Sequence, residues 1–283
     1  MPLRRRDAHG RRQKLTAQEP DMSPRLNDKV AFITGAGIGG IGAASALAFA
    51  KEGARVAVCD ILPERGEATV AEISAAGGEA FFVRADVSSD DQVRAAIEST
   101  VAKFGALHVL MCSAGGSIPE DDFIADVDLT VFDHTMRLDL LGTMLACRYA
   151  IPEIIKSGGG SVVNMSSGAA LRGASPAHVY TAAKGAIISL TRALAGTYAK
   201  DHVRVNAIAA GRILSKRILE SIGAPGQAGS VPDRQDAAGR LKDYPFWVGG
   251  PEDIASIALF LASEESKMVT GATIPADGGR SAY

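Results

Sequence analysis

Short apolar runs alternate with helical patterns along the chain after residue 28, and this alternation limits what the chain can fold into. The runs cover residues 29–34, 55–60, 80–86, 108–116, 159–167, 204–211 and 271–279. Segments with apolar residues at helical spacing, such as 41–53 and 64–76, lie between them. Near-continuous apolar strands separated by helices are typical of a parallel sheet covered on both faces. The sequence therefore predicts an α/β fold with a single doubly wound parallel sheet.

The first 21 residues differ from the rest in composition. They hold six basic and three acidic residues and no apolar run. The missing apolar run argues against a secretory signal peptide, and Asp7 and Glu19 argue against a transit peptide. We expect residues 1–21 to be a disordered basic extension, or Met22 to be the true start, and residues 22–283 to form one domain.

Composition excludes several classes of function. No stretch approaches the ~18 uninterrupted apolar residues of a membrane-spanning helix, and a formal net charge of −2 gives no basic excess for nucleic acid. The three cysteines and five histidines are scattered without metal-ligand spacing. We therefore expect no membrane, nucleic-acid or metal partner, and unpaired thiols in a reducing, cytoplasmic compartment.

A glycine-rich loop follows the first predicted strand. It reads "TGAGIGGIG" from Thr34 to Gly42 and leads directly into a helix. Glycines let the backbone approach a pyrophosphate, and the helix N-terminus offers N–H groups and a positive dipole end. A plain turn would also explain a glycine string, but the strand–loop–helix context favours a dinucleotide site in a Rossmann fold. The residues predicted to bind it here are Gly35, Gly37, Gly40, Ile41 and Gly42.

An acidic residue, Asp60, ends the second predicted strand, 25 residues after Gly35. A carboxylate there can accept hydrogen bonds from the adenosine ribose hydroxyls and would repel a 2′-phosphate. No Lys or Arg lies within the glycine loop to neutralise such a phosphate. The sequence therefore favours NAD over NADP, although Asp60 could instead cap the following helix and Arg65 is a nearby cation.

Tyr180 and Lys184 are four residues apart in a segment with a helical apolar pattern. This spacing places both side chains on one helix face, where an ammonium stabilises a phenolate. Tyr180 is thereby a candidate proton donor and acceptor. Ser167 closes a predicted strand at the carboxyl edge, where open parallel sheets bind ligands. Each residue also has a structural explanation, a surface Tyr–Lys pair or a helix-capping Ser, but the glycine loop and Asp60 favour the catalytic one.

Together these motifs resemble the short-chain dehydrogenase/reductase family over about residues 25–279. The resemblance rests on "TGAGIGGIG", Asp60, "ADV" at 85–87, Ser167, Tyr180-x-x-x-Lys184, "RVNAIAAG" at 204–211 and "DGG" at 277–279. It implies that Tyr180 is the acid/base, that Ser167 holds the substrate oxygen, and that Lys184 binds the nicotinamide ribose. By position, Asp86 would lie by the adenine and Ser215 near the carboxamide. The remaining cofactor-binding residues implied are Val87, Ala114, Gly115, Gly211 and Ile213.

The chain departs from the family pattern in the glycine loop, which is one residue longer, at Cys112-Ser113 for the usual Asn-Asn, and at Ala210 for the usual Pro. A further departure is Asp139, which stands where the family has the Asn that anchors a proton-relay water. Its charge close to Lys184 should favour the ammonium form. We hypothesise that Asp139 is a working member of the catalytic set; the alternative is a local cap or pairing.

The predicted activity is hydride transfer between NAD and a secondary alcohol or ketone, with the protein moving one proton. The alternative is a catalytically silent dinucleotide-sensing protein on the same fold. The family resemblance also implies a homo-oligomer, a tetramer or dimer, built through the helices of Asp139 and Tyr180.

The substrate itself is not apparent in the sequence. Residues 212–250 occupy the place of the family's substrate cover and include Tyr244, Phe246 and Trp247, which would pack it on the body. Arg172, His178 and Arg212 stand next to catalytic positions in sequence. They would face an anionic or polyhydroxylated substrate, or be ordinary surface cations.

Overall fold

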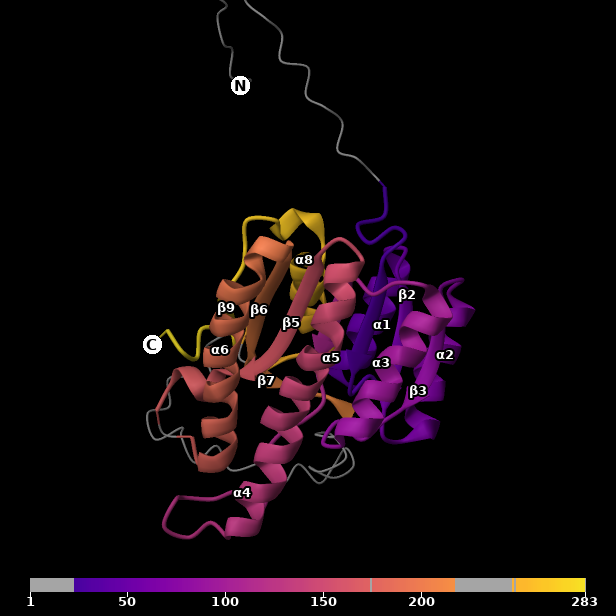
Figure 1. The fold of residues 1–283 in the computed structure, drawn as a ribbon. Coiled ribbons are helices and arrows are strands. Elements are labelled where there is room, and N and C mark those ends of the chain that lie inside the picture. Colours follow the sequence, from indigo (N-terminus) through magenta and orange to yellow (C-terminus); the bar gives the residue numbers. More distant parts are fainter. Residues whose placement is uncertain (1–22, 174, 217–245, 247, 283) are drawn as a thin grey trace, which may run out of the picture.

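The fold is built on one seven-stranded parallel sheet (Figure 1). The structure, a computed structural model, describes residues 23–173, 175–216, 246 and 248–282. The strands are β1 Val30–Thr34, β2 Arg55–Asp60, β3 Glu79–Arg84, β4 Val109–Cys112, β5 Gly160–Ser167, β6 Val203–Ala210 and β9 Thr273–Ala276. Their order is β3-β2-β1-β4-β5-β6-β9 with every neighbouring pair parallel, which confirms the predicted doubly wound sheet.

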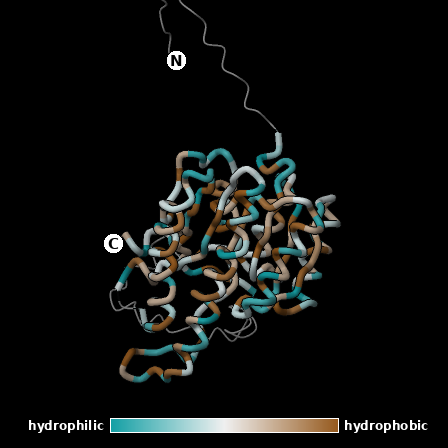
Figure 2. The backbone as a smooth tube through the Cα atoms, in the orientation of Figure 1, coloured by the Kyte–Doolittle hydropathy of each residue, from teal (hydrophilic) through white to brown (hydrophobic). Residues whose placement is uncertain are grey.

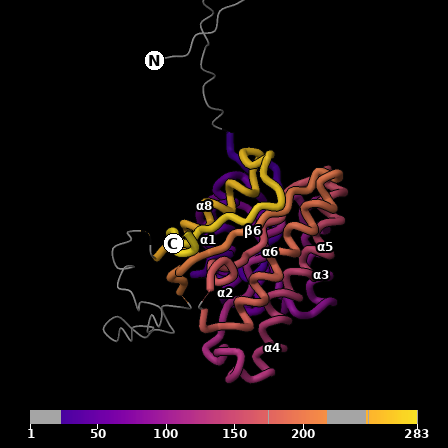
Figure 3. Tube along the Cα trace, turned by 90° about the vertical axis from the view of Figure 1, so that its left-hand side faces the viewer, coloured from indigo at the N-terminus to yellow at the C-terminus, as the bar shows by residue number. Residues whose placement is uncertain are grey.

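Helices cover both faces of the sheet, as Figure 3 shows from the side. One layer contains α1 Ile41–Lys51, α2 Pro63–Ala75 and α8 Pro251–Ala262, and the other contains α3 Asp90–Phe104, α5 Gly142–Lys156 and α6 His178–Tyr198. Shorter elements are α4 Leu129–Thr135, the π-helical turn η1 Met136–Leu141, and the 3₁₀ turns η2 Gly168–Leu171, η3 Ala199–Asp201 and η5 Glu264–Ser266. A small parallel pair, β7 Arg212–Ile213 and β8 Val248–Gly249, lies outside the main sheet.

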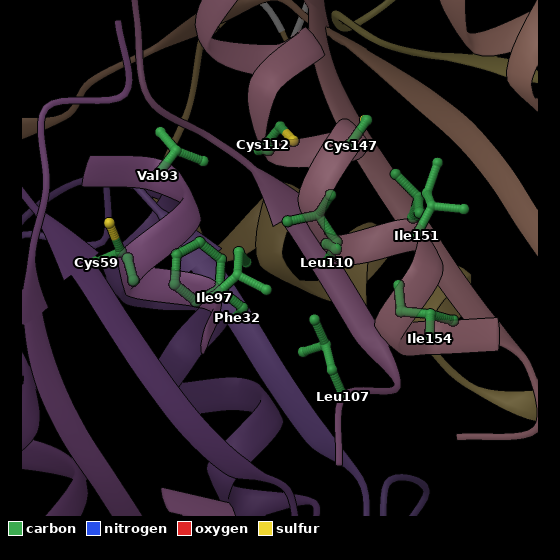
Figure 4. Close-up of a cluster of buried hydrophobic side chains, with 14 of the residues drawn as sticks. Phe32, Cys59, Val93, Ile97, Leu107, Leu110, Cys112, Cys147, Ile151 and Ile154 are labelled. Atoms are coloured by element: carbon green, nitrogen blue, oxygen red, sulfur yellow. The ribbon is translucent and has the colours of Figure 1, made fainter. Parts of the chain in front are cut away.

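The hydrophobic core consists of two clusters, one on each face of the sheet. Because successive strand residues point to opposite faces, Phe32 and Leu110 join the cluster under α3 and α5 (Figure 4), whereas Ile33 and Met111 join the cluster under α1 and α8. Strands buried on both sides need apolar residues at every position. This explains why the sequence shows continuous apolar runs rather than alternation.

The sheet positions a ligand site at its carboxyl edge. The strand order reverses between β1 and β4, so the connections leaving these two neighbouring strands go to opposite faces and leave a crevice. The runs predicted as strands over 80–86 and 108–116 are shorter in the structure, ending at Arg84 and Cys112. Their remaining residues are loops at this edge, because the backbone turns there to line the crevice.

Apolar segments run through the interior, and a further one projects at the connection between β4 and α4 (Figure 2). Phe123 and Ile124 lie exposed in that connection. No helix in the described part of the chain is long and apolar enough to span a membrane. The predicted N-terminal extension, residues 1–21, and most of the predicted substrate cover, including Tyr244 and Trp247, lie outside the described residues.

Candidate active site

The glycine loop after β1 makes two close backbone approaches that require glycine. Gly35 has a φ of +62°, and a Cβ there would lie 2.6 Å from the Ala114 Cα in the loop after β4. A Cβ at Gly37 would lie 2.7 Å from the Asp60 Oδ2, which accepts the Gly37 N–H at 2.8 Å. The loop is also tied to α2, because Ile38 donates to the Arg65 carbonyl and accepts from the Arg65 guanidinium, at 3.0 Å each.

A cavity of about 310 Å³ lies over this loop. Most residues predicted for the dinucleotide line it, namely Gly35, Gly37, Gly40, Ile41, Asp60, Asp86, Val87, Ala114, Gly115 and Ser215. Its size is within the range of ligand pockets. The α1 helix begins beside it at Ile41, and its N-cap, Gly40, has no side chain, so its first-turn N–H groups have no side-chain cap among the described residues. Such an end suits a phosphate.

The Asp60 carboxylate accepts two backbone N–H groups beside this cavity. Its Oδ2 accepts the Gly37 N–H and its Oδ1 accepts the Leu62 N–H at 3.0 Å, just before α2. The second contact forms the turn before α2, whose N-cap is Leu62 and has no side-chain cap, so Asp60 does not cap that helix. Asp60 keeps acceptor capacity for a ligand, because a carboxylate has about four acceptor sites and Asp60 lines the cavity.

Gly42 differs from the other predicted cofactor residues, because it lies beneath the loop and outside the cavity lining. A Cβ at Gly42 would lie 2.4 Å from the Gly35 carbonyl oxygen. Its role in the described structure is to let α1 pack closely against the loop.

We expect Gly42→Ala to lower the free energy of unfolding by about 1–3 kcal/mol, as overpacking does, and to weaken NADH binding by displacing Gly35. The matched control is Gly196→Ala on α6, where an added Cβ meets nothing within 4 Å. That change should be neutral or stabilising by up to about 1 kcal/mol. Urea unfolding measures the change in stability, and fluorescence titration measures the change in NADH affinity. Equal stability and equal NADH affinity in the two variants would contradict this packing role of Gly42.

A second cavity, of about 130 Å³, adjoins the first and shares Ile41, Ser113, Gly115 and Ser215 with it. The predicted catalytic residues meet here. The lining includes Ser167, Tyr180 and Lys184 with the predicted cofactor residues Gly211 and Ile213. The structure thus joins the end of β5, one face of α6 and the loop after β6 next to the dinucleotide-sized cavity.

Ser167 lies at the junction of β5 and η2. Its Oγ accepts the Ala169 N–H at 3.2 Å and so caps the 3₁₀ turn. The hydroxyl keeps a donor proton, since it only accepts in this contact. Capping therefore orients the Ser167 side chain toward the cavity while leaving its donor available.

Lys184 is buried in an ion pair with Asp139. The Lys184 Nζ lies 2.8 Å from the Asp139 Oδ1, and these side chains are 4% and 0% exposed. Lys184 also donates to the Met165 carbonyl at 3.1 Å, and its Nζ lies 5.5 Å from the centre of the Tyr180 ring. Burial opposes the ammonium form, but the Asp139 carboxylate, with a smaller contribution from Tyr180, raises the pKa of Lys184 above its usual value. The structure thus places Asp139 against Lys184, as the sequence predicted, and the effect of Asp139 on catalysis stays a prediction.

Asp139 lies on the π-helical turn η1 and lines neither cavity. Its Oδ1 also accepts the Gly116 N–H at 3.1 Å. A Cβ at Gly115, whose φ is +128°, would lie 2.3 Å from that oxygen, so glycine is needed for this approach. Its Oδ2 is buried with no hydrogen-bond partner among the described residues. π turns occur often at functional sites.

Asp121 is a residue of this site that the sequence did not reveal. Its buried carboxylate accepts the N–H groups of Tyr180 at 2.7 Å and Val179 at 3.2 Å. The residue before α6, Ala177, gives no side-chain cap, so Asp121 supplies the cap from a distant loop. His178, one of the candidate substrate residues, accepts the Ile124 N–H at 2.9 Å and packs edge-on against Phe123. The β4–α4 connection therefore holds the turn that carries Tyr180.

Other cavity residues were also missed. Ile61, Leu62 and Leu138 line the larger cavity, and Met165 and Ser166 line the smaller one. Single residues of these types carry no sequence signal of ligand contact, whether they follow a strand, as Ile61 and Leu62 do, or lie within an element. Within the described residues, no group of three His, Cys, Asp or Glu side chains is placed to hold a metal ion.

Comparison with known proteins gives consistent similarities. The sequence model of a family described as "Enoyl-(Acyl carrier protein) reductase" matches residues 35–281. The chain is 37% identical to 2-(S)-hydroxypropyl-CoM dehydrogenase 3 of Xanthobacter autotrophicus, over 92% of this chain and 100% of that protein. It is 37% identical to 2,5-dichloro-2,5-cyclohexadiene-1,4-diol dehydrogenase LinX of Sphingobium indicum, over 91% and 98%. The solved structure of a short-chain type dehydrogenase/reductase from Mycobacterium ulcerans has a TM-score of 0.79 and 29% identity, over 91% of both chains.

Proposed function

The chain belongs to the short-chain dehydrogenase/reductase family, and from this premise we propose that it interconverts a secondary alcohol and a ketone with NAD, using Tyr180 as acid/base. The observation that carries the proposal is that Ser167, Tyr180 and Lys184 line one cavity adjoining the dinucleotide-sized one. The two relatives named above as dehydrogenases support an alcohol as the substrate.

The protein's part in the reaction is to orient the substrate and move one proton. A bound nicotinamide would supply the hydride acceptor in the oxidative direction. As the carbinol C–H bond breaks and its electron pair leaves with the hydrogen, the O–H proton passes to the Tyr180 oxygen and a C=O bond forms. Ser167 would donate a hydrogen bond to the substrate oxygen and hold it toward Tyr180.

Lys184 would hold the nicotinamide ribose and stabilise the Tyr180 phenolate. An ammonium has three donors, and Asp139 and the Met165 carbonyl take two of them. The third is available to the cavity that Lys184 lines. Asp139 would act through Lys184 as a positioning residue, fixing the direction of that donor.

A panel of secondary alcohols, polyols, sugars and cyclic diols with NAD, followed by absorbance of reduced cofactor, tests the proposal. We expect turnover with at least one class. Silence across a wide panel, with NAD shown to bind, would favour the dinucleotide-sensing alternative instead.

The preference for NAD is proposed from Asp60 at the end of β2. We expect the kcat/KM for NADH to exceed that for NADPH by at least about tenfold, because a 2′-phosphate would meet the Asp60 carboxylate. Asp60→Asn keeps an acceptor for the Gly37 N–H and removes the negative charge. It should therefore lower the ratio of kcat/KM for NADH to kcat/KM for NADPH. A native preference for NADPH, with Arg65 holding the phosphate in the same cavity, would refute the assignment.

We also propose a homo-oligomer, a tetramer or dimer. Exposed apolar residues gather on the β4–α4 connection, α4 and α5, namely Phe123, Ile124, Leu129, Phe132 and Met144. Met144→Glu should reduce the native mass measured by light scattering, because it places a charge on α5. Met268→Glu, at another exposed methionine, is the matched control and should not. A monomeric native protein would refute the proposal.

A further inference from the structure

A third cavity, of about 100 Å³, lies on the other side of Ser167. It shares Ser167, Ala210 and Gly211 with the cavity of Tyr180 and Lys184, so the two adjoin at the reacting end of the site. A single water needs only ~10–15 Å³ of such space. The cavity therefore has room for several non-hydrogen atoms of a substrate held at Ser167.

Three arginines line this small cavity. Arg172 follows η2, Arg212 begins β7, and Arg280 lies in the turn after β9. Each is half-buried. The segments are distant in sequence, and the fold gathers them at one point next to Ser167. A guanidinium withdrawn from water binds carboxylate and similar anions through paired N–H donors.

The described acid in the lining, Asp277, has both oxygens engaged by backbone. Its Oδ1 accepts the Gly279 N–H at 3.0 Å and its Oδ2 accepts the Ser281 N–H at 2.9 Å. These contacts form the turn that carries Arg280. Asp277 also packs closely on Gly211, where a Cβ would lie 2.5 Å from the Asp277 Cα. The carboxylate therefore shapes the wall, and the described lining contains three arginines and this one acid.

From this geometry we infer that the substrate carries a compact anionic group, such as a carboxylate, that binds between Arg172, Arg212 and Arg280 while its hydroxyl or keto oxygen lies at Ser167. The inference deepens the proposed function and rests on it. The substrate class is a hydroxy acid and its keto acid. The redox step is the one already given, and the anionic group takes no part in it.

The test compares each acid with its neutral counterpart. The probes are 3-hydroxybutyrate and 4-hydroxycyclohexanecarboxylate, each against its methyl ester, with NAD and the full-length protein. We expect the acids to have the higher kcat/KM. Arg172→Gln, Arg212→Gln and Arg280→Gln should each lower kcat/KM for the acid about tenfold to hundredfold, as loss of a charge-assisted hydrogen bond does, and leave the ester within about threefold.

Arg94→Gln is the matched control, because Arg94 is an exposed arginine on α3 paired with Asp91. Arg94→Gln should leave kcat/KM unchanged for both the acids and the esters. Melting temperature and NADH titration verify that each variant folds and binds cofactor. The inference would be overturned if the esters had a higher kcat/KM than the acids, or if the three substitutions left the acid-to-ester ratio of kcat/KM unchanged. Either result would leave the proposed function standing. If no probe and no alcohol of the wider panel reacts while NAD binds, the proposed function fails and the inference falls with it.

Discussion

Replacing Tyr180 with Phe is expected to lower kcat by roughly 10²–10⁴-fold, the range of general acid–base catalysis, and to leave NADH affinity within a few-fold. The substitution removes one oxygen from the wall of the cavity that also holds Ser167 and Lys184. The ring stays, and so does its contact with the Lys184 ammonium 5.5 Å from the ring centre. The proton of the substrate hydroxyl then has no acceptor when the hydride leaves.

Tyr149→Phe is the matched control for this loss of a hydroxyl. Tyr149 lies on α5, and its hydroxyl bonds the Asp90 carboxylate at 2.8 Å, away from both cavities. Its kcat should equal that of the native protein. Steady-state kinetics with the best alcohol and fluorescence titration of NADH measure the two effects. An undiminished kcat for Tyr180→Phe would exclude the Tyr180 mechanism.

Replacing Asp139 with Ala is expected to lower the free energy of unfolding by about 3–5 kcal/mol, the cost of leaving one member of a buried ion pair uncompensated. Lys184 remains in the interior with only the Met165 carbonyl among its described acceptors. Asp139→Asn should cost less, because an amide oxygen can still accept from Lys184 and Gly116. Urea unfolding gives the difference.

The double variant Asp139→Asn/Lys184→Met separates charge from packing. Removing both charges should cost less than Asp139→Ala alone, because no buried charge is left unpaired. A double variant as unstable as Asp139→Ala would show that packing, rather than the ion pair, sets the stability. Activity is not informative for this variant, since Lys184 is in the proposed catalytic set.

The pH dependence of stability follows from the same pair. Because the pKa of Lys184 is raised in the folded protein, its contribution to stability is fully present below the unfolded value of ~10.4 and is lost as the pH rises through the folded value. The native melting temperature should therefore fall above about pH 10, and Asp139→Asn should reduce that fall. The pH–rate profile of Asp139→Asn is the companion measurement, and an unchanged profile would leave Asp139 without a role in proton transfer.

Much of the fold follows from the sequence because its strands are buried on both faces. Phe32 and Ile33 are adjacent in β1 yet belong to opposite core clusters, so a continuous apolar run is the direct signature of such a strand. The predicted ends of the strands were less accurate than the predicted strands themselves. Asp86 and Gly115 follow their strands without a break in composition, and only the turn of the backbone at the crevice ends the ladder.

The site was predictable where its signal is local. Tyr180 and Lys184 are four residues apart on one helix, and the glycine loop stands directly between a strand and a helix. Asp121 gave no signal, because the N–H groups that it caps lie 58 and 59 residues away. Arg280 joins Arg172 and Arg212 only through the pairing of β9 with β6 and the turn that follows. Contacts of this kind depend on the register of the whole sheet.

The π turn at Met136–Leu141 makes the distance between α4 and α5 one residue longer than an uninterrupted α-helix would need. Deleting a single residue there would let α4 and α5 continue as one regular α-helix and would remove the widened turn that carries Asp139. Asp139 would then leave Lys184 while α5 kept its place on the sheet. The number of residues, as well as their identity, is therefore fixed at this turn.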